Sequence, residues 1–218
     1  MAGGRRRQPW YVGGTTTYDA QTTSLASLSG GYWSSLAKND IVVVASTCYN
    51  AAQNPTISTA GYNTLANLTQ GSLRLVVAYK RMGATPDTEV VVPNTDREVV
   101  VAWAFRGASA TTAIDATTTT SQASSTAMDN PAITTVTPAA IVLAIGASHG
   151  TAAASPTNPA GMSAIASGVN TWNLGFDSVS VRASYIAVGQ AGSYDPAAWT
   201  TTSSVAQWCA VTVALRPA

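Results

Sequence analysis

The chain has few charged side chains. Asp, Glu, Lys and Arg make up 10% of its 218 residues, against about 25% in an average soluble domain. Thr, Ser and Ala fill the difference, so we expect a surface that is rich in hydroxyl groups and weakly charged. Because weak surface charge gives little repulsion between molecules, this composition favours a protein that works inside an assembly.

The positive charge that the chain does carry is concentrated at its N-terminus. The formal net charge is +1, and removing the three charges of Arg5, Arg6 and Arg7 leaves −2 on the rest. Nucleic-acid-binding domains instead spread Lys and Arg over one face, and no apolar run approaches the roughly 18 residues of a membrane helix. We therefore expect no nucleic-acid and no membrane partner, and we interpret the arginines as part of a docking arm for an acidic partner. Contact of the arginines with nucleic acid is the weaker alternative.

Residues that carry chemistry are scarce as well. The single histidine, His149, follows an apolar run, where a loop residue is a better interpretation than a catalytic base. Cys48 and Cys209 fall in hydrophobic strand patterns, so we expect two small buried side chains rather than zinc ligands. Composition leaves a Ser-His-Asp arrangement open, and a calcium site near Asp129 and Asn130 has no supporting motif. We therefore predict a protein without catalytic residues, metal or cofactor.

Helix patterns are missing, and strand patterns recur instead. No window longer than about ten residues keeps a 3.6-residue period, whereas apolar and β-branched residues alternate in short segments bounded by Gly, Pro, Asn and Asp. These segments cover residues 40–49, 73–81, 98–106, 140–146, 178–188 and 205–215, with a weaker one at 89–92. They predict an all-β fold, a single antiparallel β-sandwich that is jelly-roll-like, with one wet face on each sheet. A division after residue 108 would leave each half with too few strands to close its own core, so we expect one domain at residues 32–218.

Two segments lack a clear strand pattern. Residues 111–128 form a Thr, Ser and Ala tract that is either a long surface loop or an extended edge segment. Residues 1–31 are rich in Gly, which interrupts regular elements, so we expect an extended N-terminal arm. Trp10 and Tyr11 would be exposed on an isolated arm, so they should pack against a partner or back onto the body. The predicted docking residues are Arg5, Arg6, Arg7, Trp10 and Tyr11.

Aromatic residues near the C-terminus offer a second kind of contact. Trp172, Tyr194 and Trp199 lie among Asn and Thr in a loop-rich region, and exposed aromatic rings in such surroundings are typical of a glycan-binding surface. Anchoring of loops or of the core is the competing interpretation, because Trp is seldom left exposed. Trp103 and Trp208 lie within strand patterns and should be packing residues.

A set of short motifs accompanies the strands. They are a strand after Asn-Asp, a Pro-containing loop that leads to Gly-Tyr, strands that end in Tyr-Lys and Arg-Gly, and a closing strand that ends in Ala-Leu-Arg-Pro. The matching segments are Asn39-Asp40-Ile-Val-Val, Pro55 to Gly61-Tyr62, Leu75 to Lys80, Val101 to Gly107 and Trp208 to Pro217, with Ala191-Gly-Ser-Tyr194 before the last strand. This pattern resembles a domain common in structural proteins of tailed bacteriophages, over about residues 32–218. The resemblance implies a jelly-roll-like sandwich in an accessory virion component, and it carries no catalytic set.

Together these features predict a non-enzymatic structural protein of a phage virion, assembled in the host cytoplasm because the N-terminus lacks a signal peptide's apolar core. It would decorate the capsid or form part of a head fibre or tail, and it would attach to other virion proteins through residues 1–31. We expect a homo-oligomer, with a homotrimer as the predicted state. A carbohydrate-binding module that contacts host glycan through Trp172, Tyr194 and Trp199 is the alternative. A glycan hydrolase is disfavoured because no pair of acidic residues has the expected spacing.

Overall fold

The computed structural model of the chain describes residues 8–26, 28–31, 35–50, 52–93, 96–116, 118–125, 127–150, 157–172, 177–199 and 205–218. Within these ranges the backbone forms strands, turns and bends. They contain no helix, and hence none that is long and apolar enough to cross a membrane. The all-β fold predicted from the sequence is confirmed.

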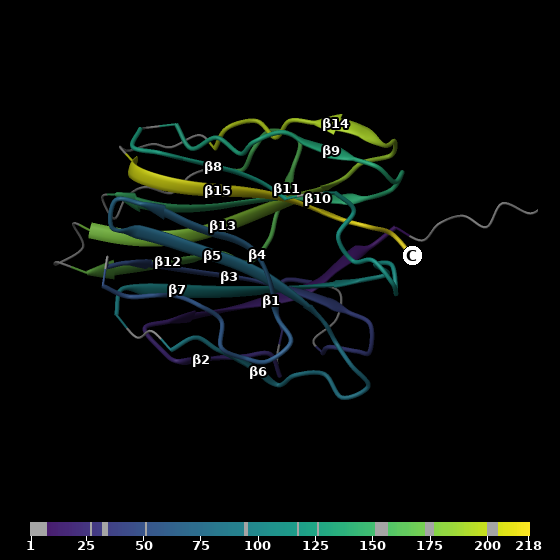
Figure 1. Ribbon diagram of the computed structural model, residues 1–218, viewed down its shortest axis with the longest axis horizontal. Coiled ribbons are helices and arrows are strands. Elements are labelled where there is room, and N and C mark those ends of the chain that lie inside the picture. Colours follow the sequence, from purple (N-terminus) through teal and green to yellow (C-terminus); the bar gives the residue numbers. More distant parts are fainter. Residues whose placement is uncertain are drawn as a thin grey trace, which may run out of the picture.

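The first half of the chain forms a five-stranded antiparallel sheet, which we call the N-sheet (Figure 1). Its strands lie in the order β1–β7–β3–β5–β4. Their bounds are β1 (Trp10–Tyr18), β3 (Ile41–Tyr49), β4 (Asn63–Gln70), β5 (Leu73–Arg81) and β7 (Glu98–Arg106). Alternating Val, Leu and aromatic residues give these strands their β-propensity.

The second half forms the other large antiparallel sheet, the C-sheet. Its order is β8–β15–β10–β13, and two short strands, β11 and β12, pair with the free edge of β13. Their bounds are β8 (Thr119–Ala123), β10 (Ile141–Gly150), β11 (Ser163–Ala164), β12 (Gly168–Trp172), β13 (Asp177–Ala187) and β15 (Val205–Leu215). The chain thus completes one sheet before it begins the other, whereas in a jelly roll it passes back and forth between the two.

Two small ribbons complete the fold. The N-ribbon pairs β2 (Thr22–Ser24) with β6 (Glu89–Val91), and the C-ribbon pairs β9 (Ile133–Thr135) with β14 (Gly192–Tyr194). Figure 1 shows the N-ribbon beneath the N-sheet and the C-ribbon above the C-sheet, so that the molecule has four layers.

The two halves have the same topology. If the principal strands of each half are numbered from one to five, and β11 and β12 together count as the third strand of the second half, both sheets have the order 1–5–2–4–3. In both halves the ribbon joins the connection after the first strand to the connection after the fourth. The chain therefore contains a structural repeat, with one copy in each sheet.

Strand register places counterpart residues at the same height in the two copies. Ile41 pairs with Phe105 in the N-sheet, as Ile141 pairs with Leu215 in the C-sheet. The backbone repeats as well: Asn39 and Ala139, two residues before these isoleucines, both have a positive φ, of 70° and 64°. This agreement extends the repeat from strand order to single residues.

The main core lies between the N-sheet and the C-sheet and draws on both. The inter-sheet contacts are reciprocal: β7 packs on β12 and β13, while its counterpart β15 packs on β4 and β5. Likewise β1 packs on β12 as β8 packs on β4. Tyr49 and His149, which are counterparts, stack on each other with ring centroids 3.5 Å apart and planes at 4°. Such reciprocity is the mark of an isologous interface, so the halves are related by an approximate twofold axis.

The outer faces of both sheets are covered, which corrects the prediction of one wet face on each sheet. On the N-sheet, Val42 and Val100 pack with Leu25 and Val90 of the N-ribbon region. On the C-sheet, residues of the C-ribbon and of neighbouring loops pack against β10 and β15. This cover explains why β3 and β10 are buried along almost their whole length.

Each predicted strand segment contains or overlaps a strand: β3, β5, β6, β7, β10, β13 and β15. Residues 111–128 include β8, which pairs only with β15, so the edge-segment interpretation holds for those five residues. The two-sheet sandwich is therefore confirmed. Both sheets contribute to the main core, and the expectation that neither half closes a core alone stays a prediction.

The predicted N-terminal arm is partly wrong, because Trp10–Tyr18 form β1 at the edge of the N-sheet. Glycines suggested an irregular segment there, but Gly13 pairs with Ala104 in the ladder, and the register shift between Tyr11 and Gly13 leaves Val12 as the extra residue. Such a bulge lets a strand continue past a residue that does not fit the ladder. Of the two interpretations of Trp10 and Tyr11, packing back onto the body is the one that the structure confirms.

Candidate functional site

Both ends of the described chain lie at the same end of the sandwich, which we call the terminal end (Figure 1). Trp10, at the start of β1, is half-buried, and its ring lies so close to Gly107 that a Cβ there would approach it to 2.8 Å. The N–H of the C-terminal residue Ala218 donates to the carbonyl of Gly107 over 2.9 Å. Gln8, the first described residue, therefore leaves the body next to the C-terminus.

The predicted docking residues do not form one group. Arg5, Arg6 and Arg7 lie outside the described residues. Tyr11 is 6% exposed and packs in the main core. Of the two predicted docking residues that are described, only Trp10 lies at the point where the N-terminal segment joins the body.

An ion pair closes each sheet at the terminal end. Arg106, at the end of β7, makes two hydrogen bonds to the buried carboxylate of Asp40, of 2.8 and 2.7 Å. Its counterpart Arg216 donates from Nε to Asp115 over 3.1 Å. Asp40 and Asp115 do not occupy counterpart positions in the two halves. Both halves therefore have the same arginine, but its acidic partner differs.

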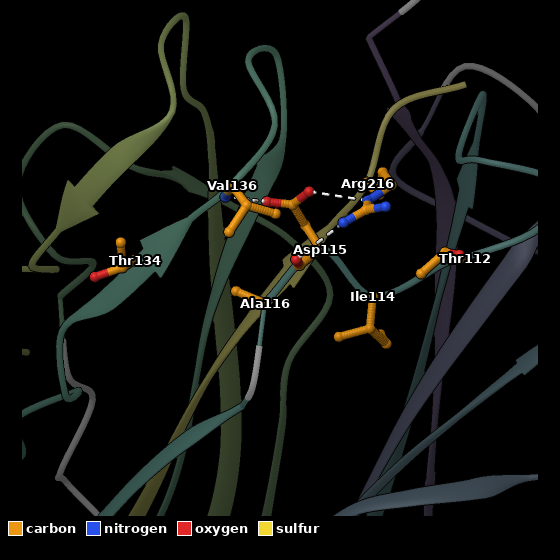
Figure 2. A pocket seen from close by; sticks show the side chains of 7 residues that line it. All are labelled: Thr112, Ile114, Asp115, Ala116, Thr134, Val136 and Arg216. Carbon is orange, nitrogen blue, oxygen red and sulfur yellow. Dashed lines mark hydrogen bonds and ion pairs between the residues drawn. The ribbon is translucent and has the colours of Figure 1, made fainter.

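A cavity of about 740 Å³ opens beside the second ion pair, lined by Thr112, Ile114, Asp115, Ala116, Thr134, Val136 and Arg216. Figure 2 shows the carboxyl group of Asp115 between Val136 and Arg216. Burial raises the pKa of Asp115, but hydrogen bonds from Thr137, Val136 and Arg216 outweigh burial and hold the pKa below its ordinary value. This carboxylate is therefore fully engaged within the protein. Val136 is 60% exposed at the rim.

The three aromatic residues of the predicted glycan surface are not brought together as an exposed patch. Trp199 is 2% exposed, and its indole N–H donates to the side-chain oxygen of the buried Asn130 over 2.6 Å. Its assignment to a binding surface is therefore wrong, and the competing interpretation as an anchor is confirmed. Tyr194 is half-buried against the outer face of the C-sheet, and the side chain of Trp172 lies outside the described residues.

The two tryptophans predicted to be packing residues, Trp103 and Trp208, are both buried. Trp103 is fully buried and donates from Nε1 to the carbonyl of Ala166 over 2.7 Å. Trp208 is 5% exposed and donates to Ser125. Both tryptophans are packing residues, as expected. Their N–H groups reach polar partners, as buried indoles usually require.

The cysteine and histidine side chains, which could carry chemistry, lie inside the structure. Cys48 and Cys209 are buried free thiols, and burial raises their pKa values to about 11 and about 12, so both interpretations as inert core residues are confirmed. His149 was expected in a loop, but it lies in β10, is 9% exposed, and stacks on Tyr49. Within the described part of the chain, no three His, Cys, Asp or Glu residues lie close enough to hold a metal ion. Asn130, named above for a calcium site, uses its amide on Trp199 and on two backbone carbonyls instead.

A second pocket, which sequence reasoning missed, opens between the edge of the N-sheet and the edge of the C-sheet. We call it the seam pocket; it has a volume of about 330 Å³ and is lined by Tyr11, Gly30, Gly31, Ala164 and Tyr185. Tyr11 lies in β1, Ala164 in β11 and Tyr185 in β13, so three strands from both sheets build it. Its residues come from two segments far apart in the sequence, 11–31 and 164–185, and no local motif brings them together.

The resemblance to a tailed-phage structural domain stays a prediction. No protein-family model, no curated protein and no solved structure matches the chain. The functional conclusion therefore has to come from the two ends of the sandwich and from its pockets.

Proposed function

We propose that this protein is a non-enzymatic structural component of a phage virion, attached to other virion proteins by the segment that precedes β1. The observation that carries the proposal is the position of Gln8. It leaves the body at the terminal end, beside the C-terminus, so that Arg5, Arg6 and Arg7 are tethered to that end.

The anchoring of Trp10 supports the same role. Its half-buried ring against Gly107 fixes the place where the N-terminal segment starts. Because β1 is hydrogen-bonded along β7, a pull on that segment is carried into the sheet rather than into a loop. The opposite end, where β1, β3 and β10 finish, would then face away from the particle.

The body suits exposure within an assembly. Its charged residues are few, and the ion pairs at the terminal end hold Asp40 and Asp115 inside the protein. A homo-oligomer, with a homotrimer as the first state to test, belongs to the same proposal and is measured by sedimentation equilibrium of the purified chain.

Removal of residues 1–7 tests the attachment. The cut must stop there, because a longer deletion would remove Trp10 and Tyr11 and with them the edge of the N-sheet. We expect the shortened protein to keep its melting temperature and to lose binding to purified phage particles from the source, measured by antibody-gold labelling in the electron microscope. The full chain should label one site, either the head or the tail.

A control that removes one positive charge elsewhere on the body tests for general electrostatic attraction. R97Q removes a positive charge that lies just before β7, at the end opposite to the termini, and it should leave labelling unchanged. Equal labelling by the full chain and by the shortened protein would remove the docking role of residues 1–7. Absence of label from every particle would overturn the virion assignment itself.

A further inference from the structure

The seam pocket contains an aromatic cluster that joins the two sheets. Tyr11 and Phe105 come from the N-sheet and Tyr185 comes from the C-sheet. The ring of Tyr11 lies 5.7 Å from that of Phe105 and 6.1 Å from that of Tyr185, and Phe105 meets Tyr185 edge-on at 6.4 Å. Because neighbouring rings hold one another in place, the two tyrosines present a preformed wall to the pocket.

The rest of the lining is small and uncharged. Gly30, Gly31 and Ala164 leave space in front of the rings, and their backbone groups lie at the pocket wall without a long side chain over them. A Cβ on Gly31 would come within 1.9 Å of the carbonyl oxygen of Val12, so only glycine allows this turn to lie against β1. None of the described residues that line the pocket is Asp, Glu, Lys, Arg or His.

Tyr11 keeps its proton at neutral pH. Burial, reinforced by the nearby phenol of Tyr185, raises the pKa of Tyr11 above its ordinary value of 10. The described lining residues therefore offer no counter-charge to a charged ligand, and moving an unpaired charge out of water is costly. The seam pocket therefore favours a neutral, ring-shaped ligand. Such a ligand would place an apolar face against the tyrosine ring, and its hydroxyl groups would bond to the backbone and to the phenols.

The structural repeat supplies an internal comparison, because the opposite seam has the same framework. Tyr79 is the counterpart of Tyr185, since it pairs with Val43 as Tyr185 pairs with Leu143. The counterparts of Tyr11 and Phe105 on that side are Ile114 and Leu215. The fold alone therefore does not require the aromatic cluster, and the cluster distinguishes one seam from the other.

We propose that the seam pocket binds a neutral pyranose unit of a glycan, with the ring of Tyr185 against the apolar face of the sugar. Gly30, Gly31 and Ala164 provide the room and the backbone groups for the sugar hydroxyls. This site is separate from the attachment role proposed above, because none of its lining residues belongs to residues 1–7. It also replaces Trp199, which is buried, as the aromatic contact for a glycan.

Titration of the full-length protein tests the proposal. The probes are methyl glucoside, methyl galactoside, methyl mannoside and N-acetylglucosamine, each added to about 100 mM because one sugar ring in a shallow pocket is expected to bind with about millimolar affinity. The readout is the backbone amide spectrum from ¹H–¹⁵N NMR. We expect at least one probe to shift the amides of Gly30, Gly31 and Ala164 in a saturable manner.

Two matched variants separate recognition from folding. Y185A removes the proposed stacking ring and should weaken binding by about tenfold or more, which is the effect of losing about 1.4 kcal/mol. Y79A removes its counterpart, which is also half-buried against the main core, and it should leave the affinity unchanged. Y185F keeps the ring and should bind within a few-fold of the natural protein, so it covers the case in which Y185A does not fold.

Three results would overturn the proposal. The first is that none of the four sugars shifts these amides. The second is equal weakening by Y79A and Y185A, since that would trace the loss to stability rather than to contact. The third is a shift of the same amides by a proline-rich peptide but by no sugar, which would assign the pocket to a peptide. The attachment test with the protein that lacks residues 1–7 is independent of these three results, so either proposal can fail without the other.

Discussion

The carboxyl group of Glu98 lies fully buried at the start of β7. The hydroxyl of Ser46 donates to Oε1 of Glu98 over 2.9 Å. The backbone N–H of Glu98 donates to the carboxylate of Asp19 over 2.8 Å. Burial raises the pKa of Glu98 to about 8, with the hydrogen bond from Ser46 acting against that shift and the charge of Asp19 adding to it. At neutral pH the fold thus favours the protonated form of this side chain.

We expect this residue to make stability depend on pH. In the unfolded chain the carboxyl ionises above about pH 4.5, whereas in the folded protein it keeps its proton up to about pH 8. Stability from Glu98 is therefore complete below about pH 4.5, falls as the pH rises toward 8, and stays low above it. E98Q keeps the acceptor for Ser46 without a charge, so its advantage in free energy of unfolding should grow over this range by about 1.4 kcal/mol per pH unit, to a few kcal/mol in all.

Urea unfolding at pH 5, 6.5 and 8.5 measures this difference between E98Q and the natural protein. E89Q is the matched control, because Glu89 is an exposed acid in β6, and its effect should be small at all three values of pH. A difference that is equally large at pH 5 and at pH 8.5 would contradict a buried carboxyl that resists ionisation.

At the scale of elements, the same turn precedes β3 and β10. Asn39 and Ala139 both adopt a left-handed backbone, with φ of 70° and 64°. The next residues also make counterpart hydrogen bonds: the N–H of Met82 donates to the backbone carbonyl of Asp40, and the N–H of Val188 donates to that of Ala140. Asn tolerates this conformation through its short polar side chain, whereas Ala has no such compensation and costs about 1–2 kcal/mol there.

A substitution at the second turn should therefore stabilise the protein. We expect A139G to raise the free energy of unfolding by about 0.5–1 kcal/mol, after allowing for the greater freedom of glycine in the unfolded chain. In a chain of this size that corresponds to about 1–4 °C in melting temperature, measured by circular dichroism. A140G changes the adjacent buried residue, where φ is not positive, and should destabilise. A139G that is no more stable than A140G would contradict strain at this turn.

How far the sequence predicts the elements depends on where their partners lie. Strands β3, β5, β7, β10, β13 and β15 carry apolar residues in continuous runs or in alternation with polar ones, and these local patterns were sufficient to find them. β1 was missed because Gly13 and Gly14 resemble a break, whereas both pair with residues of β7 and continue the strand.

The candidate sites were harder to predict than the strands. Trp199 was misassigned because its partner Asn130 lies 69 residues away, and loop composition carries no information about that hydrogen bond. The seam pocket was missed for the same reason, since β1, β11 and β13 meet only in the folded chain. The repeat escaped detection because counterparts such as Phe105 and Leu215 share burial and register rather than identity.

At the scale of the whole molecule, the repeat determines what can fold alone. Each half supplies one large sheet and covers its outer face with its own ribbon. The inner faces meet in a single main core, to which both sheets contribute. A half without the other would expose that entire inner face to water, and burial of apolar area is the main favourable contribution to folding.

We therefore expect the two halves to unfold together although they are built as separate sheets. Differential scanning calorimetry should show one transition, with a calorimetric enthalpy equal to the van't Hoff enthalpy. Leu75 in the N-sheet and its counterpart Val181 in the C-sheet both face the main core, so L75A and V181A should each move the whole transition downward. Removal of the leucine side chain costs about 2–5 kcal/mol, and removal of the smaller valine side chain should cost less.

Hydrogen exchange at single amides separates this outcome from independent unfolding of the sheets. In L75A the slowest amides of β10, in the other sheet, should lose protection by the same free energy as those of β3, because opening either sheet uncovers the shared core. Protection that falls in β3 alone, or two resolved calorimetric transitions, would mean that each sheet and its ribbon hold together without the other. In that case the main core would be a contact between two folding units, rather than the core that makes one unit of them.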